Sequence, residues 1–163
     1  MANTASGQAQ KVPNFKPAAV FFDGAGFNPF GVDAADAIGS DSTTPDGYPD
    51  VVFAIGQQHL ELGNYHGLHG FLAVYRNTQN WATPANGLAL FQHIDLGAET
   101  VPGEVEWADL TGDARLDIVV AVGTPYPDQG GNGPWGIRVY NFDTTTQNFQ
   151  LRMDLRTPFR SAV

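Results

Sequence analysis

The stretch WADLTGDARLDIVVAVG, Trp107 to Gly123, holds the pattern that decides the fold. Oxygen-bearing side chains occupy the first, third, fifth and ninth positions of its loop, at Asp109, Thr111, Asp113 and Asp117. An apolar run rich in β-branched residues, Ile118 to Val122, follows at once. Runs of this kind favour a buried strand. The stretch therefore predicts an acidic loop that leads directly into a β-strand.

A similar stretch occurs earlier in the chain, so the sequence contains an internal repeat. Four pairs of segments match in the same order: VDAAD (32–36) with VEWAD (105–109), PDVVFAIG (49–56) with LDIVVAVG (116–123), GFLAVYRN (70–77) with GIRVYNF (136–142), and FQHIDL (91–96) with FQLRMDL (149–155). Each segment is short, strand-like and bounded by turn-forming residues. No segment has a helical 3.6-residue period. Four antiparallel strands per unit is the composition of a β-propeller blade.

We therefore expect an all-β fold of antiparallel four-stranded β-propeller blades, about two blades with a partial strand at each end. Residues 1–14 are expected to form a flexible N-terminal segment, and 15–29 a strand that completes a neighbouring blade. The first blade is predicted at 30–97 and the second at 98–155. Residues 156–163 are expected to begin a further blade or to form an exchanged strand. Two blades do not close a ring, which typically takes about four to eight.

Composition excludes several functions. The net charge of −9 argues against nucleic acid as a partner, because binding to phosphates requires a basic surface. Cysteine is absent, so the chain has neither disulfides nor a thiolate zinc site. No apolar run is long enough for membrane insertion, and the N-terminus lacks the apolar region of a secretory signal.

The loop DLTGDARLD is suited to a calcium ion, because Ca²⁺ takes about six to eight oxygen ligands. A cation would also offset the repulsion among the three aspartates. The alternative interpretation is that these residues only close a turn by accepting hydrogen bonds from backbone N–H groups. In particular, Asp50 and Asp117 are candidates for such a capping role.

These residues resemble the FG-GAP, or VCBS, repeat of integrin-α-like β-propellers, whose pattern is D-x-[DN]-x-D-G-x-x-D ahead of a strand such as DIVVA. Thr111 and Ala114 depart from it at the third position and at the glycine. In the first unit Asp36, Asp46 and Asp50 match positions one, five and nine, and Asp41 or Ser40 is the candidate third ligand. The resemblance implies Ca²⁺ as cofactor, an extracellular or cell-surface location, and a role in binding proteins or glycans.

The loops between the second and third strands of each unit carry aromatic residues, and binding residues concentrate in such loops. Tyr65, His66, Tyr126 and Trp135 are the candidate ligand-binding residues, with packing against neighbouring blades as the alternative. A zinc site from His59, Glu61, His66 and His69 matches no standard spacing. Glu104 and Glu106 lie on one strand, so they cannot flank a glycosidic bond. No catalytic arrangement is evident, and we expect no enzyme.

The sequence therefore predicts a non-catalytic, calcium-stabilised, extracellular β-propeller module for adhesion or assembly. One alternative is a carbohydrate-binding, lectin-like propeller. Another is a structural subunit of a self-assembling ring or filament. The expected partners are other copies of the chain or further blades of a longer one, and a glycan or protein ligand.

Overall fold

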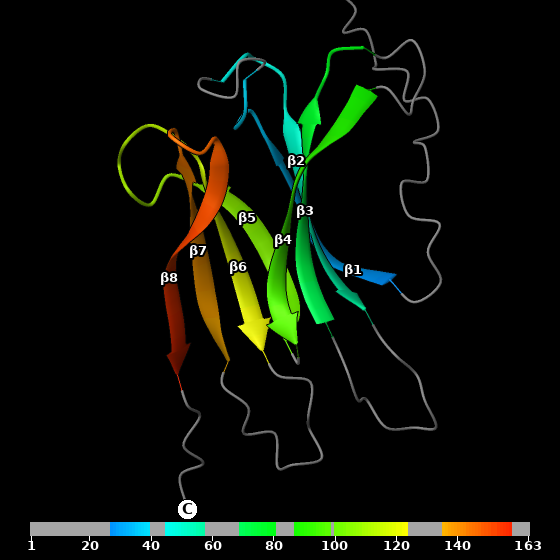
Figure 1. Ribbon diagram of the computed structural model, residues 1–163, viewed down its shortest axis with the longest axis vertical. Coiled ribbons are helices and arrows are strands. Elements are labelled where there is room, and N and C mark those ends of the chain that lie inside the picture. The colour runs from blue at the N-terminus through cyan, green and yellow to red at the C-terminus, as the bar shows by residue number, and fades with distance from the viewer. Residues whose placement is uncertain are drawn as a thin grey trace, which may run out of the picture.

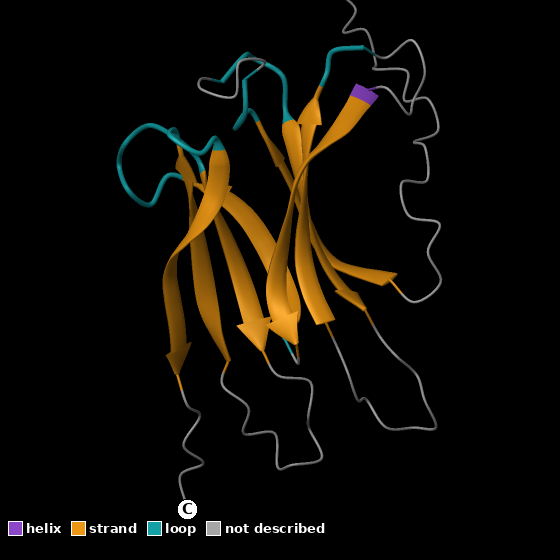
Figure 2. Cartoon of the chain, in the orientation of Figure 1, coloured by secondary structure: helices purple, strands orange, loops and turns teal. Residues whose placement is uncertain are grey.

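A computed structural model describes residues 27–39, 45–57, 69–80, 87–98, 100–123 and 135–157, and these residues form eight strands. The first sheet contains β1 (Phe27–Ala35), β2 (Asp50–Gln57), β3 (His69–Asn77) and β4 (Leu88–Ala98). The second contains β5 (Val101–Ala108), β6 (Asp117–Gly123), β7 (Trp135–Asp143) and β8 (Asn148–Thr157). Figures 1 and 2 show the two sheets next to each other.

Each sheet is a simple antiparallel meander, with the strands in chain order β1-β2-β3-β4 and β5-β6-β7-β8. The predicted all-β fold with two four-stranded antiparallel sheets is confirmed. Neither sheet closes on itself. Among the described residues, no helix has the length and apolar character needed to cross a membrane.

The two first strands carry the same irregularity. The register of β1 on β2 shifts between Pro29 and Gly31, and that of β5 on β6 shifts between Pro102 and Val105. At this point β1 lies directly against β5, because a Cβ on Gly31 would be only 2.8 Å from the carbonyl oxygen of Gly103. Glycine is therefore required at position 31 by the close approach of two backbones.

One apolar core fills the space between the sheets. The first sheet contributes Val52, Ala54, Leu72, Val74, Ile94 and Leu96, and the second contributes Val105, Trp107, Ile118, Val120, Val122, Tyr140 and Phe149. The rings of Trp107 and Phe149 lie 5.4 Å apart between centroids. Burial of this apolar surface is the main force that holds the sheets together.

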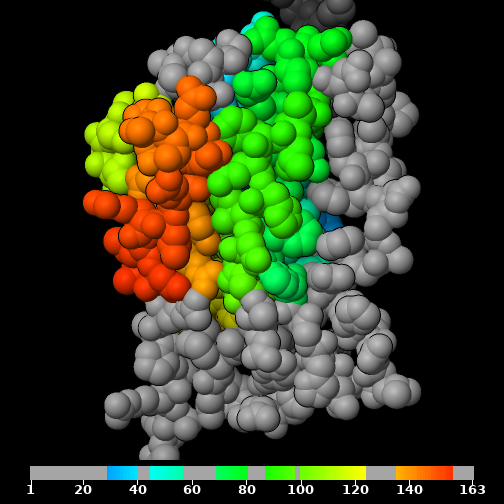
Figure 3. Space-filling model, in the orientation of Figure 1, coloured from blue at the N-terminus to red at the C-terminus, as the bar shows by residue number. Residues whose placement is uncertain are grey.

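Polar bonds add a defined register between the sheets. The carboxylate of Asp33 on β1 accepts a 2.8 Å hydrogen bond from the backbone N–H of Trp107 on β5. The side chain of Gln92 on β4 both donates to the carbonyl of Phe149 at 2.9 Å and accepts from its N–H at 2.7 Å. The Gln92 bonds join β4 of the first sheet to β8 of the second, and Figure 3 shows β4 (green) beside β8 (orange to red) on this side of the molecule.

Candidate functional site

The second acidic loop, between β5 and β6, is organised by its own aspartates. The carboxylate of Asp109 accepts hydrogen bonds from the backbone N–H groups of Gly112 at 2.7 Å and Ala114 at 3.0 Å. Asp113 accepts from the N–H of Arg115 at 3.0 Å. Asp117 accepts from the N–H of Leu110 at 3.0 Å. The chain thus turns tightly around carboxylate oxygens, as an Asx-type turn does.

The first acidic loop, between β1 and β2, shares two of these bonds although it is longer. Asp36 accepts from the N–H groups of Asp46 at 2.9 Å and Gly47 at 2.7 Å. Asp46 accepts from the N–H of Tyr48 at 3.1 Å. The two loops lie at the same end of the molecule (Figure 1).

A left-handed residue lies at the same place in both loops, at Gly47 with φ of 87° and at Ala114 with φ of 65°, and the second loop has another at Gly112 with φ of 74°. In the described residues the two loops therefore agree in two N–H bonds and in this left-handed residue. Ser40 and Asp41 lie outside the described residues.

The ninth-position aspartates, Asp50 and Asp117, are buried at the start of β2 and β6. Asp50 accepts from the N–H groups of Ala37, Ile38 and Asn77 at 3.1, 2.6 and 2.9 Å. Asp117 also accepts from the side-chain amide of Asn141 at 2.7 Å. Both residues therefore cap the loop by accepting N–H bonds and tie it to the third strand of the sheet.

Burial raises the pKa of both ninth-position carboxyls above the ordinary 3.8, against the opposing effect of their hydrogen bonds. Nearby like charges add to the increase: Asp46 acts on the pKa of Asp50, and Asp113 and Asp109 act on that of Asp117. The acidic side chains of each loop are thus close enough to repel one another, which is the condition that a bound cation would relieve.

The geometry of the loops bears on the calcium hypothesis. Within the described residues, no three His, Cys, Asp or Glu side chains gather into a metal-binding group. The carboxylates instead point into their own backbone amides, and Thr111 is exposed in the second loop. Each carboxylate oxygen that accepts one N–H retains a further lone pair. A calcium role therefore stays a prediction about these loops.

Of the predicted ligand-binding residues, Trp135 is the one that the structure describes; Tyr65, His66 and Tyr126 lie outside the described residues. Trp135 is the first residue of β7 and is 50% exposed. Its ring covers Gly123 so closely that a Cβ there would be 2.4 Å from two ring carbons. Phe30 covers Gly56, the glycine at the corresponding end of β2, in the same way. Trp135 therefore packs on its own sheet.

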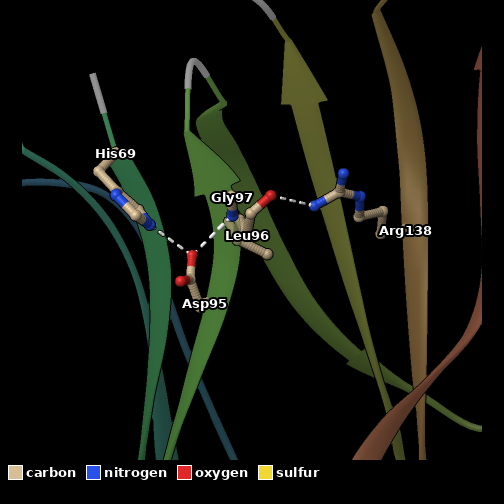
Figure 4. Close-up of polar contacts among 5 residues, drawn as sticks. All are labelled: His69, Asp95, Leu96, Gly97 and Arg138. Carbon is tan, nitrogen blue, oxygen red and sulfur yellow. Dashed lines mark hydrogen bonds and ion pairs between the residues drawn. The ribbon is translucent and has the colours of Figure 1, made fainter. Parts of the chain in front are cut away.

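His69 on β3 contacts an aspartate on β4. Its Nε2 lies 2.5 Å from Oδ1 of Asp95, which also accepts the N–H of Gly97 at 2.7 Å (Figure 4). These bonds, with the backbone N–H as the largest effect, lower the pKa of Asp95 below its ordinary value. His59 and Glu61, also considered for zinc, lie outside the described residues.

Arg138 is a residue whose role was not predicted from the sequence. Its guanidinium is buried and donates to the carbonyl of Leu96 at 2.6 Å (Figure 4). It also donates to the carboxylate of Asp154 at 3.1 Å. It thus links β7 to β4 of the other sheet. A single arginine in the apolar run of β7 was the available signal. Gln92 and Asn141 were also missed, because polar residues in strands give no local indication of their partners.

The two sheets use opposite faces for their contact. Val52 and Ala54 on β2 correspond to Val119 and Ala121 on β6, because PDVVFAIG matches LDIVVAVG. Val52 and Ala54 lie in the inter-sheet core, whereas Val119 and Ala121 lie on the other side of β6 from the core residues Ile118, Val120 and Val122.

The paired strands extend this observation across the whole sheet. Leu72 lies opposite Ala54, and Ile137 lies opposite Ala121. Leu72 and Ile137 therefore correspond. Leu72 is fully buried between the sheets, but Ile137 is 45% exposed. On β1 and β5 the buried residue belongs to the second sheet instead. Val105 on β5 is 2% exposed, whereas its counterpart on β1, Val32, is 58% exposed.

Each sheet therefore has an inner face in the core and an outer face that corresponds to the inner face of the other sheet. On the second sheet the outer face carries Val119, Ala121, Ile137, Val139, Met153 and Leu155. Of these, Ile137, Met153 and Leu155 are among the exposed large apolar residues. We call this set the second outer face. The first outer face carries Val32 and Ala34 on β1, which are exposed, and Phe53, Ile55 and Ala73 on β2 and β3, of which Ile55 and Ala73 are buried.

Comparisons with protein-family models, with curated proteins and with solved structures find no match for this chain.

Proposed function

We propose that this chain is a non-catalytic scaffold module for adhesion or assembly at the cell surface, and that its two sheets are consecutive blades of a β-propeller of the FG-GAP type. The observation that carries the proposal is the use of opposite faces by corresponding residues. Blades arranged around an axis pack in this manner, with the front of one on the back of the next. A two-fold sandwich would instead bring equivalent faces together.

The equivalence of the two acidic loops also supports the proposal. Both loops lead from the first strand to the second of their sheet and share the same N–H bonds to aspartate. Two copies of a duplicated blade are expected to agree in this way, whereas two unrelated sheets are not expected to share these bonds. The proposed role of Ca²⁺ is to offset the repulsion within each loop, with Asp36, Asp46 and Asp50 or Asp109, Asp113 and Asp117 as ligands.

The exposed apolar side chains suggest that the module functions by binding a partner that covers them. Soluble proteins seldom leave contiguous apolar surface exposed unless it is a contact site, and blades of a repeat architecture bury their faces against neighbours. Ile137 and Leu155 are 45% and 55% exposed on one sheet face. Assembly with further blades would remove these side chains from water.

Binding of the dye ANS to dilute, monomeric protein tests this proposal, because the dye fluoresces on exposed apolar surface. We expect binding that the double substitution Ile137→Glu, Leu155→Glu abolishes. Leu151→Glu, on the same strand as Leu155, is the control and should leave the ANS fluorescence unchanged. A monomer that binds no ANS, or whose binding ignores the double substitution, would contradict the proposal.

A further inference from the structure

We infer that the second outer face docks onto the first outer face of another copy of this chain. The inference rests on the proposed function and names the partner. The chain carries the two halves of one interface twice: once joined in its own core, and once on its two outer faces, where Ile137, Met153, Leu155 and Val32 are exposed. A second copy supplies the face that corresponds to the one already used inside the molecule.

The apolar parts of the two interfaces correspond residue by residue. In the core, Leu72 and Ile94 of the first sheet lie at the positions that Ile137 and Leu155 occupy in the second, since Leu72 pairs with Ile94 and Ile137 with Leu155. All four are branched aliphatic side chains of similar volume. The second outer face thus offers a partner nearly the same surface that the first sheet offers to β5 and β6.

The receiving side is matched on β1. Within the molecule, Val105 and Trp107 of β5 receive the first sheet and are buried. Their counterparts on β1 are Val32, which is 58% exposed, and Ala34, which is also exposed. Val32 is thus the residue through which a copy would close the same contact.

A polar contact of the core is matched in its acceptor but not in its donor. Asp33 accepts the N–H of Trp107 across the core. Glu106 takes the place of Asp33 on β5, because it lies opposite Val119 as Asp33 lies opposite Val52. The N–H that corresponds to that of Trp107 belongs to Ala34, which already donates to Asp33 at 2.8 Å, so the contact between copies does not repeat this bond.

Several positions differ between the interfaces. Ala34 is small where Trp107 fills the core, and Met153 stands where Gln92 bonds to the backbone of Phe149. Glu104 stands where Gly31 allows the closest approach of β1 to β5, so the contact between copies is wider at this end. Ala73 stands where Arg138 reaches across to Leu96, so the contact between copies lacks that bond. The interface between copies is therefore expected to be weaker than the one inside the chain.

Such docking is heterologous, because a different face is used on each copy. Repetition gives a closed ring if the rotation closes and a filament if it does not. Each chain has a net charge of −9, so the copies repel one another at low ionic strength. We expect association to strengthen as salt or Ca²⁺ is added.

Two single substitutions separate the two halves of this interface. Ile137→Glu places a charge on the second outer face, and Val32→Glu places one on the first. Both sites are exposed, so the fold should persist, and circular dichroism checks this. Leu151→Glu is the matched control. Leu151 is 52% exposed on the same strand as Met153, but it pairs with Tyr140 rather than with Val139 and so lies on the other side.

Sedimentation velocity over a concentration series gives the decisive result. Wild type and Leu151→Glu should associate, while Ile137→Glu and Val32→Glu should each be monomeric. An equimolar mixture of these two variants should form a complex of two chains, because each retains the half that the other has lost. A mixture that stays monomeric would overturn the inference, as would a Val32→Glu variant that still associates through paired second outer faces.

A wild type that is monomeric at every concentration would also overturn docking between copies. If that monomer binds ANS through Ile137 and Leu155, the proposed scaffold function stands and the partner is another chain. If it binds no ANS, both proposals fail.

Discussion

At the scale of single residues, the acidic loops depend on positions that accept an unusual backbone or an unusual charge. Ala114 adopts a left-handed conformation where its counterpart is Gly47. Residues with a Cβ pay roughly 1–2 kcal/mol for this conformation. The bonds that Asp109 and Asp113 make around it hold the strained residue in place.

Ala114→Gly should therefore raise the free energy of unfolding by about 1 kcal/mol, since relief of the left-handed strain exceeds the entropy that glycine adds to the unfolded chain. Gly47→Ala should lower it by a similar amount. A Cβ on Gly47 would meet nothing within 4 Å, so steric contact does not contribute. Urea unfolding measures both, and a less stable Ala114→Gly variant would count against the left-handed turn.

Burial of Asp50 and Asp117 gives a second prediction at this scale. Their folded pKa values lie above 3.8, so the folded state binds their protons more tightly than the unfolded state does. Their contribution to stability is greatest at low pH and declines as the pH rises through the raised values. NMR titration of the carboxyl carbons in a chelator should give midpoints above 3.8. Midpoints below 3.8 would show that the N–H bonds outweigh burial.

At the scale of elements, the loops and strands were largely predictable from local pattern. The run Ile118–Val122 and its counterpart on β2 are apolar throughout, and both are buried strands. The loop bonds follow from aspartates at fixed spacing, which is a local property. The sequence match FQHIDL with FQLRMDL was misleading, because it aligns Leu96 with Leu155, whereas strand pairing places Ile94 where Leu155 lies. Strand register is set by partners distant in sequence, so this error had no local remedy.

Calcium provides a test of the loops as elements. If Ca²⁺ binds the folded loops, the melting temperature should rise in calcium relative to EDTA, with about 2.7 kcal/mol of stabilisation per site at a hundredfold excess over Kd. Asp109→Asn should remove the part of this calcium-dependent stabilisation that comes from the second loop. Asp143→Asn, in the turn between β7 and β8, is the control and should keep the full response. An identical melting temperature in calcium and EDTA would leave the backbone bonds as the sole organisers of the loops.

At the scale of the whole molecule, the account depends on how two repeated sheets lie against each other. Sequence predicted the repeat and the strands, but not which face of each sheet is buried, because Val, Ile and Ala occupy both faces of β2 and β6. The cross-sheet bonds of Gln92 and Arg138 were equally unpredictable, since their partners are carbonyl groups and backbone amides that any sequence carries. The buried face of each sheet and the cross-sheet bonds are both determined by packing between residues that are distant in sequence.

Thiol labelling of single-cysteine variants tests this packing most directly, because the natural chain has no cysteine. The variants form two corresponding pairs, Leu72→Cys with Ile137→Cys and Val105→Cys with Val32→Cys, and are labelled in dilute protein. The account predicts that positions 72 and 105 are protected while 137 and 32 react rapidly. Equal reactivity within each pair, with both members protected or both labelled, would mean that corresponding faces meet and would contradict the blade-like stack.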